Sequence, residues 1–280
     1  MIGHEKNIAD LKDLNERGAL SHGYVFVGPA MVGKKTVAVE FAEYLEKRES
    51  KEQLVLSDMM IIKPSENGSI GIDVVRGIRN FLWQKPNMST RRTLIIDDAE
   101  LLTTEAQNAL LKVTEEPPVS SLLILVTSDA ESILPTIMSR LPRLYFGAVP
   151  EKEIVTWLAS DTALKMPKTK ATEVAKKAMG KPGLAWRLLH DEDFQEQLAL
   201  AEKLLKTPLS TRRDVIKKVI EPDEFSFRKF LDAIILNLAW QAGDARTAQK
   251  TALWHKALAL YDRETNFSLN PRLQLESLLL

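Results

Sequence analysis

The sequence predicts an α/β domain built on a parallel sheet, followed by regions that are entirely helical. Three observations carry this prediction. In the first half of the chain, short apolar runs alternate with segments of helical spacing, as in strands joined by crossover helices. These runs consist almost entirely of Ile, Leu and Val, which is typical of strands buried on both faces of a parallel sheet. After Pro150 the strand patterns stop and only helical patterns follow.

Five apolar runs are expected to form the sheet of the first domain, which we place at residues 1–148. The strands are expected, in chain order, at residues 24–27, 59–62, 94–96, 122–127 and, with a weaker pattern, 144–146. The segments between them that show helical spacing are residues 34–48, 72–83, 104–115 and 131–139.

Two helical regions are expected after the sheet. Residues 149–207 are expected to form short helices, with one break at Lys181-Pro182-Gly183. Residues 208–280 are expected to form an all-helical third domain. Apolar residues recur there at helical spacing over residues 227–238 and again over residues 253–261.

Composition excludes several classes of protein. Lys plus Arg and Asp plus Glu both number 38, so the chain lacks the positive field of a protein that binds nucleic acid on its own. It contains no Cys, which excludes disulfides and thiolate zinc sites, and its four His residues show no metal-ligand spacing. There is no apolar signal region and no apolar run long enough to cross a bilayer. We therefore expect a cytoplasmic protein without membrane contact.

A phosphate-binding loop with one altered residue follows the first strand. The pattern requires Gly, four residues, Gly, Lys and then Ser or Thr, and Gly28, Gly33 and Lys34 stand at the required positions. Lys35 occupies the place of the hydroxyl that would hold Mg²⁺. Thr36 cannot substitute for it, because one helical step turns a side chain by about 100°. We expect this loop to contact ATP or ADP with weakened Mg²⁺ binding; the alternative is an ordinary glycine-rich turn.

Two acidic residues, Asp97 and Asp98, follow the buried run at residues 94–96. An acidic residue at the end of a strand in such a domain supports Mg²⁺ beside the phosphates. Asp98 stands where many ATPases have a Glu that polarises the attacking water, and Asp is one methylene shorter. Because a displacement of about 1 Å can lower a rate by roughly 10²-fold, Lys35 and Asp98 both argue against efficient hydrolysis. The alternative is a plain strand end.

Several longer motifs, spread over the whole chain, belong together. They are Ile2-Gly3-His4-Glu5, Ser21 to Pro29, Ile70 to Asp73, Ile95 to Glu100, Gln107 to Lys112, Glu115 to Pro118, Leu134 to Arg140 and Asn270 to Leu273. With these motifs the chain resembles the bacterial DNA polymerase III clamp-loader subunits of the AAA+ class, most closely those of the delta-prime type. The Asn-Ala-Leu-Leu-Lys…Glu-Glu-Pro-Pro segment and the Leu-Pro-Thr-Ile…Ser-Arg segment are the most specific part of this resemblance.

The resemblance implies an AAA+ P-loop domain, a helical lid at residues 149–207 and a collar at residues 208–280 that joins subunits in a ring. Such a ring uses ATP to open a sliding clamp and place it on primed DNA. The implied partners are gamma/tau and delta subunits, the clamp and, through the complex, primer-template DNA.

Two single residues take their expected roles from the same resemblance. Arg140 is implied to be an arginine finger for a neighbouring subunit, where fingers are worth roughly 10³–10⁵ in rate; otherwise it is a cation at a helix end. Leu141 replaces the Cys that follows the finger in the family. Thr127 is implied to be a phosphate sensor, or else a polar strand end.

Three departures from the family pattern favour a subunit that does not drive the ring. The zinc module is absent because there is no Cys, and residues 49–58 form a short polar link instead. Gly183 stands where a hydrolysing subunit has a lid arginine, and Lys35 replaces the hydroxyl. We predict a delta-prime-type clamp-loader subunit whose own ATPase activity is weak or absent. The alternatives are a gamma/tau-type motor and an unrelated P-loop NTPase.

Overall fold

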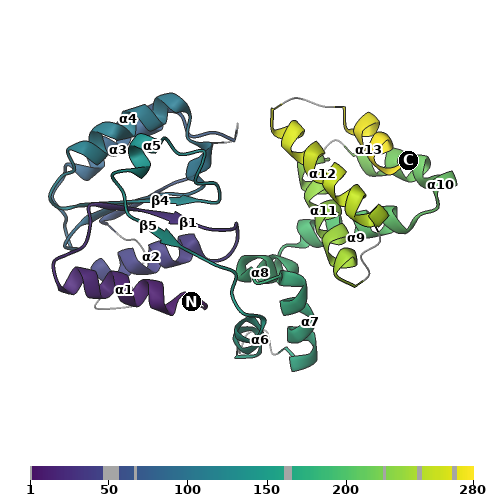
Figure 1. Ribbon diagram of the computed structural model, residues 1–280, viewed down its shortest axis with the longest axis horizontal. Coiled ribbons are helices and arrows are strands. Elements are labelled where there is room, and N and C mark those ends of the chain that lie inside the picture. Colours follow the sequence, from purple (N-terminus) through teal and green to yellow (C-terminus); the bar gives the residue numbers. More distant parts are fainter. Residues whose placement is uncertain are drawn as a thin grey trace. The chain divides into compact units, whose positions relative to one another are not determined.

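The computed structural model describes residues 2–46, 57–65, 68–160, 166–222, 225–244, 248–266 and 270–280. The chain divides into two compact units, Met1–Ala185 and Trp186–Leu280. The first unit contains the sheet and the second is helical (Figure 1). The division into three domains stays a prediction, and most of the polar link predicted at residues 49–58 lies outside the described residues.

The sheet has five strands in the order β2-β3-β4-β1-β5, and each neighbouring pair is parallel. The strands are β1 (Gly23–Val27), β2 (Met59–Ile62), β3 (Arg92–Ile96), β4 (Ser121–Thr127) and β5 (Arg143–Tyr145). The predicted parallel sheet is thereby confirmed. Because β3, β4 and β1 are adjacent and parallel, the segments that follow them emerge at the same edge of the sheet.

Helices cover both faces of this sheet (Figure 1). They are α1 (Glu5–Glu16) and α2 (Lys34–Leu45) on one face, and α3 (Ile72–Leu82), α4 (Thr104–Glu115) and the short α5 (Pro135–Met138) on the other. Successive residues of β4 point to opposite faces. Ile124 is buried in the same cluster as Phe41 of α2, and Leu125 in the same cluster as Leu110 of α4.

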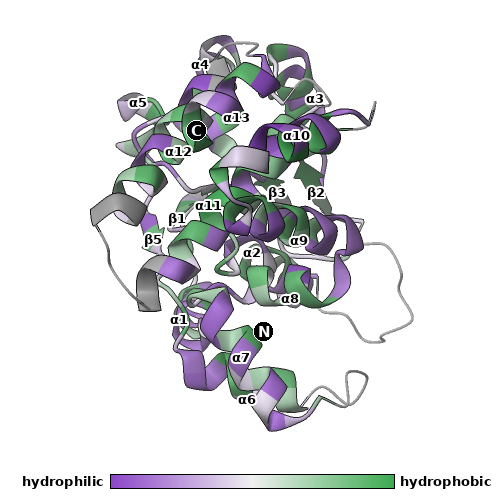
Figure 2. Cartoon of the chain, turned by 90° about the vertical axis from the view of Figure 1, so that its right-hand side faces the viewer, coloured by the Kyte–Doolittle hydropathy of each residue, from purple (hydrophilic) through white to green (hydrophobic). Residues whose placement is uncertain are grey.

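The remaining helices are α6 (Glu151–Ser160), α7 (Lys168–Ala178), α8 (Pro182–His190), α9 (Glu192–Lys206), α10 (Leu209–Ile220), α11 (Phe227–Asp244), α12 (Ala248–Asn266) and α13 (Pro271–Leu279). In the second unit, α11 packs against α9 and α12, and α10 packs against α13. The apolar residues predicted at helical spacing over residues 227–238 lie on α11 and are mostly buried, with Phe230, Leu231 and Ile234 fully covered. The helices of this unit carry hydrophobic and hydrophilic stretches side by side (Figure 2). No helix within the described ranges is long and apolar enough to span a membrane.

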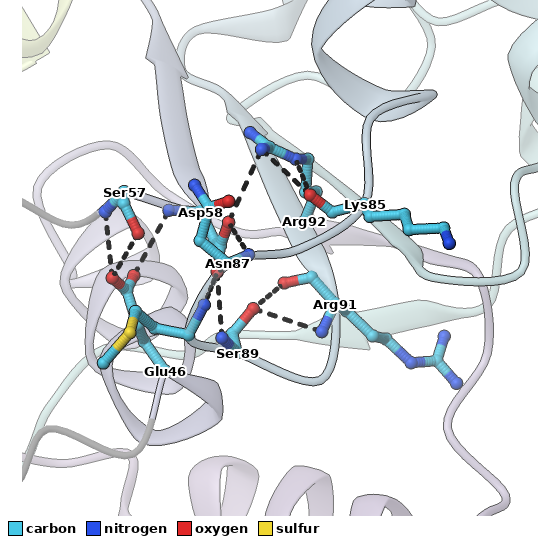
Figure 3. A network of polar contacts seen from close by, with 9 residues as sticks. Glu46, Ser57, Asp58, Lys85, Asn87, Ser89, Arg91 and Arg92 are labelled. Carbon is cyan, nitrogen blue, oxygen red and sulfur yellow. Dashed lines mark hydrogen bonds and ion pairs between the residues drawn. The ribbon is translucent and has the colours of Figure 1, made fainter.

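A polar network explains why β3 begins earlier than its apolar pattern (Figure 3). The strand starts at Arg92, and Arg92 and Thr93 are both buried although they are polar. The Arg92 guanidinium donates to the backbone oxygen of Lys85 at 3.0 and 3.1 Å and lies 3.8 Å from the carboxylate of Asp58. A prediction that looks only for apolar residues therefore places the start of β3 too late, because its first two residues are polar although buried.

Candidate functional site

The loop between β1 and α2 has the backbone shape that a phosphate loop needs. Gly28 follows β1, and a Cβ atom at this position would lie 2.1 Å from the backbone oxygen of Phe146, so no other residue fits without movement. Gly33 has a φ of 111° and Met31 a φ of 65°, both in the left-handed region. Gly33 provides no side chain to cap α2, so the first N–H groups of this helix are available to an anion.

The Lys34 side chain folds back over this loop. Its ammonium donates to the backbone oxygens of Gly28 at 2.6 Å and Pro29 at 2.7 Å, and the residue is only 6% exposed. Burial lowers the pKa of Lys34, and repulsion from Lys181 lowers it too, whereas nearby acidic residues act in the opposite direction. The only hydrogen bonds that Lys34 makes among the described residues go to uncharged carbonyl groups.

Lys35 forms an ion pair with Asp97. Its Nζ atom lies 2.7 Å from Oδ2 of Asp97, and the two side chains are 38% and 15% exposed, respectively. Lys35 stands in the first turn of α2 and Asp97 directly after β3, so the pair links two segments that emerge at the same sheet edge. Thr36, next on α2, is exposed. The structure therefore brings Lys35 and Asp97 together and leaves an ammonium where the loop pattern has a hydroxyl.

Asp98 adopts an unusual backbone conformation beside this pair. Its φ and ψ are 50° and 51°, and it starts a single 3₁₀ turn, η1 (Ala99–Leu101). Burial raises the pKa of the Asp98 carboxyl, and the negative charges of Asp97 and Glu100 raise it further. The positive charges of Lys35 and Lys34 lower it, but by less. A base that polarises water needs its charged form, and this environment disfavours that form.

The end of β4 does not turn a free hydroxyl toward the phosphate loop. Oγ1 of the buried Thr127 donates to the backbone oxygen of Asp129 at 2.8 Å and accepts from the Asp129 N–H group at 3.0 Å. Glu100 instead accepts from the backbone N–H and the hydroxyl of Ser128. The sequence motif at residues 95–100 ends in Glu100 but assigns this residue no role of its own.

Two segments distant in sequence hold the phosphate loop in place. The His4 ring contacts the backbone oxygen of Val32 through Nε2 at 2.9 Å and packs edge-on against Phe146. In the first turn of α8, the Gly183 N–H group donates to the backbone oxygen of Met31 at 2.9 Å. Position 183, where an arginine would contact a nucleotide, thus contacts the loop through its backbone. Neither contact follows from a sequence motif of the loop itself.

Arg140 lies two residues after α5 and makes its contacts with a different set of residues. Its guanidinium donates to the backbone oxygen of Thr136 at 2.6 Å and to Oε1 of Glu115, the last residue of α4, at 2.8 Å. The two charged side chains are 35% and 48% exposed, respectively. Sequence reasoning had not identified Glu115 as the partner, although it begins the Glu-Glu-Pro-Pro motif.

A bound Mg²⁺ ion does not fit this site. Mg²⁺ requires oxygen ligands at about 2.0–2.1 Å in octahedral geometry. The Asp97 carboxylate already holds the Lys35 ammonium, and position 35 offers no hydroxyl. Among the described residues, no group of three or more His, Cys, Asp or Glu side chains is arranged to hold a metal ion.

Comparison with curated proteins identifies relatives in bacterial DNA replication. The chain is 31% identical over 173 residues to the DNA polymerase III subunit gamma/tau of Mycobacterium tuberculosis (strain ATCC 25618 / H37Rv), a match that covers 57% of this chain and 30% of the relative. It is 32% identical over 136 residues to subunit delta' of Escherichia coli (strain K12), covering 49% and 40%. Against subunit delta' of Pseudomonas aeruginosa the identity is 29% over 216 residues, covering 70% and 65%. The matches thus span less than two thirds of these relatives.

Solved structures share the fold. A DNA polymerase III gamma subunit-related protein from Thermotoga maritima superposes with a TM-score of 0.67 at 22% identity, covering 97% of each chain. A RuvB variant from the same organism superposes with a TM-score of 0.51 at 18% identity, covering 86% of this chain and 80% of RuvB. These likenesses, together with the parallel sheet, confirm the predicted α/β fold, which the chain shares with these proteins.

A family profile described as DNA polymerase III, delta subunit, matches residues 3–150, which is more than half of the chain. These residues contain the sheet, the phosphate loop, the Asp97-Asp98 pair and Arg140. Two of the relatives above are delta' subunits. The chain therefore belongs to the DNA polymerase III delta subunit family.

Proposed function

We propose that this chain works as a delta-prime-type member of a clamp-loader ring that places a sliding clamp on primed DNA. Its partners would be gamma/tau and delta subunits, the clamp and, through the complex, primer-template DNA. The family membership supports the ring role, and the Lys35–Asp97 ion pair supports the delta-prime assignment. Replication of this kind takes place in the cytoplasm, where we expect the protein.

The ion pair of Lys35 carries the proposal that the chain does not hydrolyse ATP. Phosphoryl transfer in P-loop proteins relies on Mg²⁺, which is held by a loop hydroxyl and an acidic strand-end residue. Here the hydroxyl is replaced and Asp97 is occupied by an ammonium at 2.7 Å. Asp98 is a poor substitute for the water-polarising Glu, because its environment disfavours the charged form. We infer that the loop binds ATP or ADP without turnover.

The lid contact argues in the same direction. In a hydrolysing subunit the lid contributes a cation to the nucleotide, whereas Gly183 contributes only a backbone N–H group, which already bonds to Met31. A motor of the gamma/tau type would need that cation and the loop hydroxyl. The gamma/tau alternative is therefore disfavoured, and nothing in the described part of the helical second unit supports an unrelated kinase or NTPase.

Arg140 is proposed to act on the ATP site of a neighbouring subunit. Its side chain is partly exposed and its charged partner, Glu115, is about half exposed. Exposed ion pairs are worth only about 0–1 kcal/mol, so phosphate oxygens of a neighbour can compete for the guanidinium. A guanidinium binds phosphate oxygens in two-point geometry.

Assembly and turnover test the proposal together. The purified chain should show no ATP turnover above background, yet should co-purify with gamma/tau and delta subunits and be required for clamp loading. A turnover near the enzyme median of about 10 s⁻¹ for the chain alone would support the motor alternative. Failure to associate with either subunit would remove the clamp-loader role.

A further inference from the structure

The Lys35–Asp97 ion pair suggests more than a lost metal site. The pair is fixed at both ends, because Lys35 stands in the first turn of α2 and Asp97 directly follows β3. The Asp97 N–H group also donates to the backbone oxygen of Ile62 at 2.9 Å, which holds the start of this segment against β2. An ammonium is therefore fixed where P-loop proteins in general hold Mg²⁺, between the hydroxyl position of the loop and the acidic residue at the strand end.

The ammonium of Lys35 has capacity for a second partner. A lysine ammonium carries three N–H donors, and within the described residues one ion pair of Lys35, with Oδ2 of Asp97, is formed. The side chain is 38% exposed, so its remaining donors are accessible. A metal ion bound at Asp97 would have to share this carboxylate with an ammonium and would be repelled by it.

The surroundings of Lys35 contain charges of both signs, with the lysines Lys34 and Lys181 beside the carboxyl groups of Asp97, Asp98 and Glu100. Lys34 makes hydrogen bonds to carbonyl oxygens of the loop, and Lys181 lies close enough to repel it. The N-terminus of α2 has no side-chain cap. In Mg²⁺-dependent sites the metal neutralises charge on the nucleotide phosphates. Here Lys35 places an ammonium at this point, and burial, Asp97 and Glu100 disfavour the charged form of Asp98.

We propose that the phosphate loop binds nucleoside di- or triphosphate in its metal-free form, with Lys35 as a tethered cation in place of Mg²⁺. The inference rests on the proposed nucleotide site. It concerns whether that site accepts the nucleotide without Mg²⁺ or only as its Mg²⁺ complex. It requires no reaction: the ligand would be retained and released unchanged.

The test is a calorimetric titration of the full chain with ATP and ADP, once in excess EDTA and once in excess Mg²⁺. We expect similar affinity in EDTA and in Mg²⁺. Weaker binding in EDTA by about tenfold or more would overturn the proposal, because it would mean that the metal is needed. Absence of nucleotide binding both in EDTA and in Mg²⁺ would also overturn the proposal. This comparison uses the unmodified chain and does not depend on whether a variant folds.

A substitution tests Lys35 directly. Lys35→Thr restores the loop pattern. It should weaken ATP binding in EDTA by about tenfold or more, because a hydrogen bond from a charged donor is lost. Addition of Mg²⁺ should restore part of the lost affinity. The matched control is Lys152→Thr, which alters an exposed lysine in the first turn of α6 and should change nothing. Equal affinity of Lys35→Thr and the unmodified chain in EDTA would remove Lys35 from the site. Co-purification with gamma/tau and delta distinguishes this failure from failure of the clamp-loader role.

Discussion

Asp58 is a buried carboxylate of the first unit with several hydrogen-bond partners (Figure 3). Its carboxylate accepts from the backbone N–H groups of Asn87, Met88 and Ser89 at 2.7–2.9 Å, and Arg92 lies nearby. Burial raises the pKa of Asp58, but the three N–H groups and Arg92 together outweigh it, so the pKa lies below its ordinary value. This side chain fixes the loop between α3 and β3.

Replacement of Asp58 should therefore destabilise the fold in a pH-dependent way. Asp58→Asn should lower the free energy of unfolding at neutral pH by about 2–4 kcal/mol, because donors lose a charged acceptor. A depressed folded pKa means that this contribution is complete above the unfolded pKa of about 4 and is lost as the pH falls through the folded pKa. Urea unfolding at several pH values measures it. Asp10→Asn, at an exposed position on α1, is the control; equal stability of the two variants would contradict the account.

The Arg140–Glu115 ion pair should contribute little to stability. Both side chains are partly exposed, so solvent screens the pair. A double-mutant cycle with Arg140→Ala and Glu115→Ala should give a coupling energy below about 1 kcal/mol in urea unfolding. A coupling of several kcal/mol would indicate that Arg140 serves the fold and is unavailable to a neighbouring subunit.

Single residues show how far sequence reasoning reached. The loop glycines, Lys34 and the missing hydroxyl could be read from spacing alone. The partner of Lys35 could not, because Asp97 comes from another strand and only the sheet order brings the two segments to one edge. The contacts of His4 with Val32 and of Gly183 with Met31 are hydrogen bonds to backbone oxygens, which no residue pattern encodes.

At the scale of elements, the turn from β1 into α2 is sterically constrained and the middle of α3 is not. Gly28→Ala would place a methyl group 2.1 Å from a backbone oxygen, and nothing lies within 4 Å of a Cβ at Gly77. Gly28→Ala should cost about 1–3 kcal/mol. Gly77→Ala should stabilise by roughly 0.5–1 kcal/mol through helix propensity. Thermal unfolding of both variants measures this, and a tolerated Gly28→Ala would show that the loop is not as tightly packed as described.

The predicted elements agree best where apolar spacing is regular. The strand at residues 59–62 and the helix at residues 104–115 coincide with β2 and α4. Helix α1 was not predicted, because only Ile8 and Leu11 of its residues are buried and most of the helix is polar. The helix expected at residues 131–139 was too long: α5 begins only at Pro135, a residue that favours the first turn of a helix.

At the scale of the whole molecule, the second unit should be needed for assembly and not for folding of the first. A cut at residue 207 would leave α9 without α11 and would expose Phe194 and Leu198, so the better truncation ends after α8. A chain of residues 1–190 should keep a cooperative unfolding transition and lose co-purification with gamma/tau and delta. Normal assembly of this truncated chain would contradict the proposed collar.

The central claim is that Arg140 serves a neighbouring subunit, and the ATPase rate of the reconstituted loader tests it most directly. Arg140→Ala should leave folding and assembly intact and lower the DNA-stimulated rate in part, since under the proposal one site of the ring loses its arginine finger while the others keep theirs. Arg140→Lys should not restore the rate fully, because an ammonium lacks the planar fork. Arg17→Ala, which removes an exposed arginine at the end of α1, is the control and should change nothing. An unchanged rate of hydrolysis and clamp loading with Arg140→Ala would contradict the account and leave Arg140 a structural residue at the end of α5.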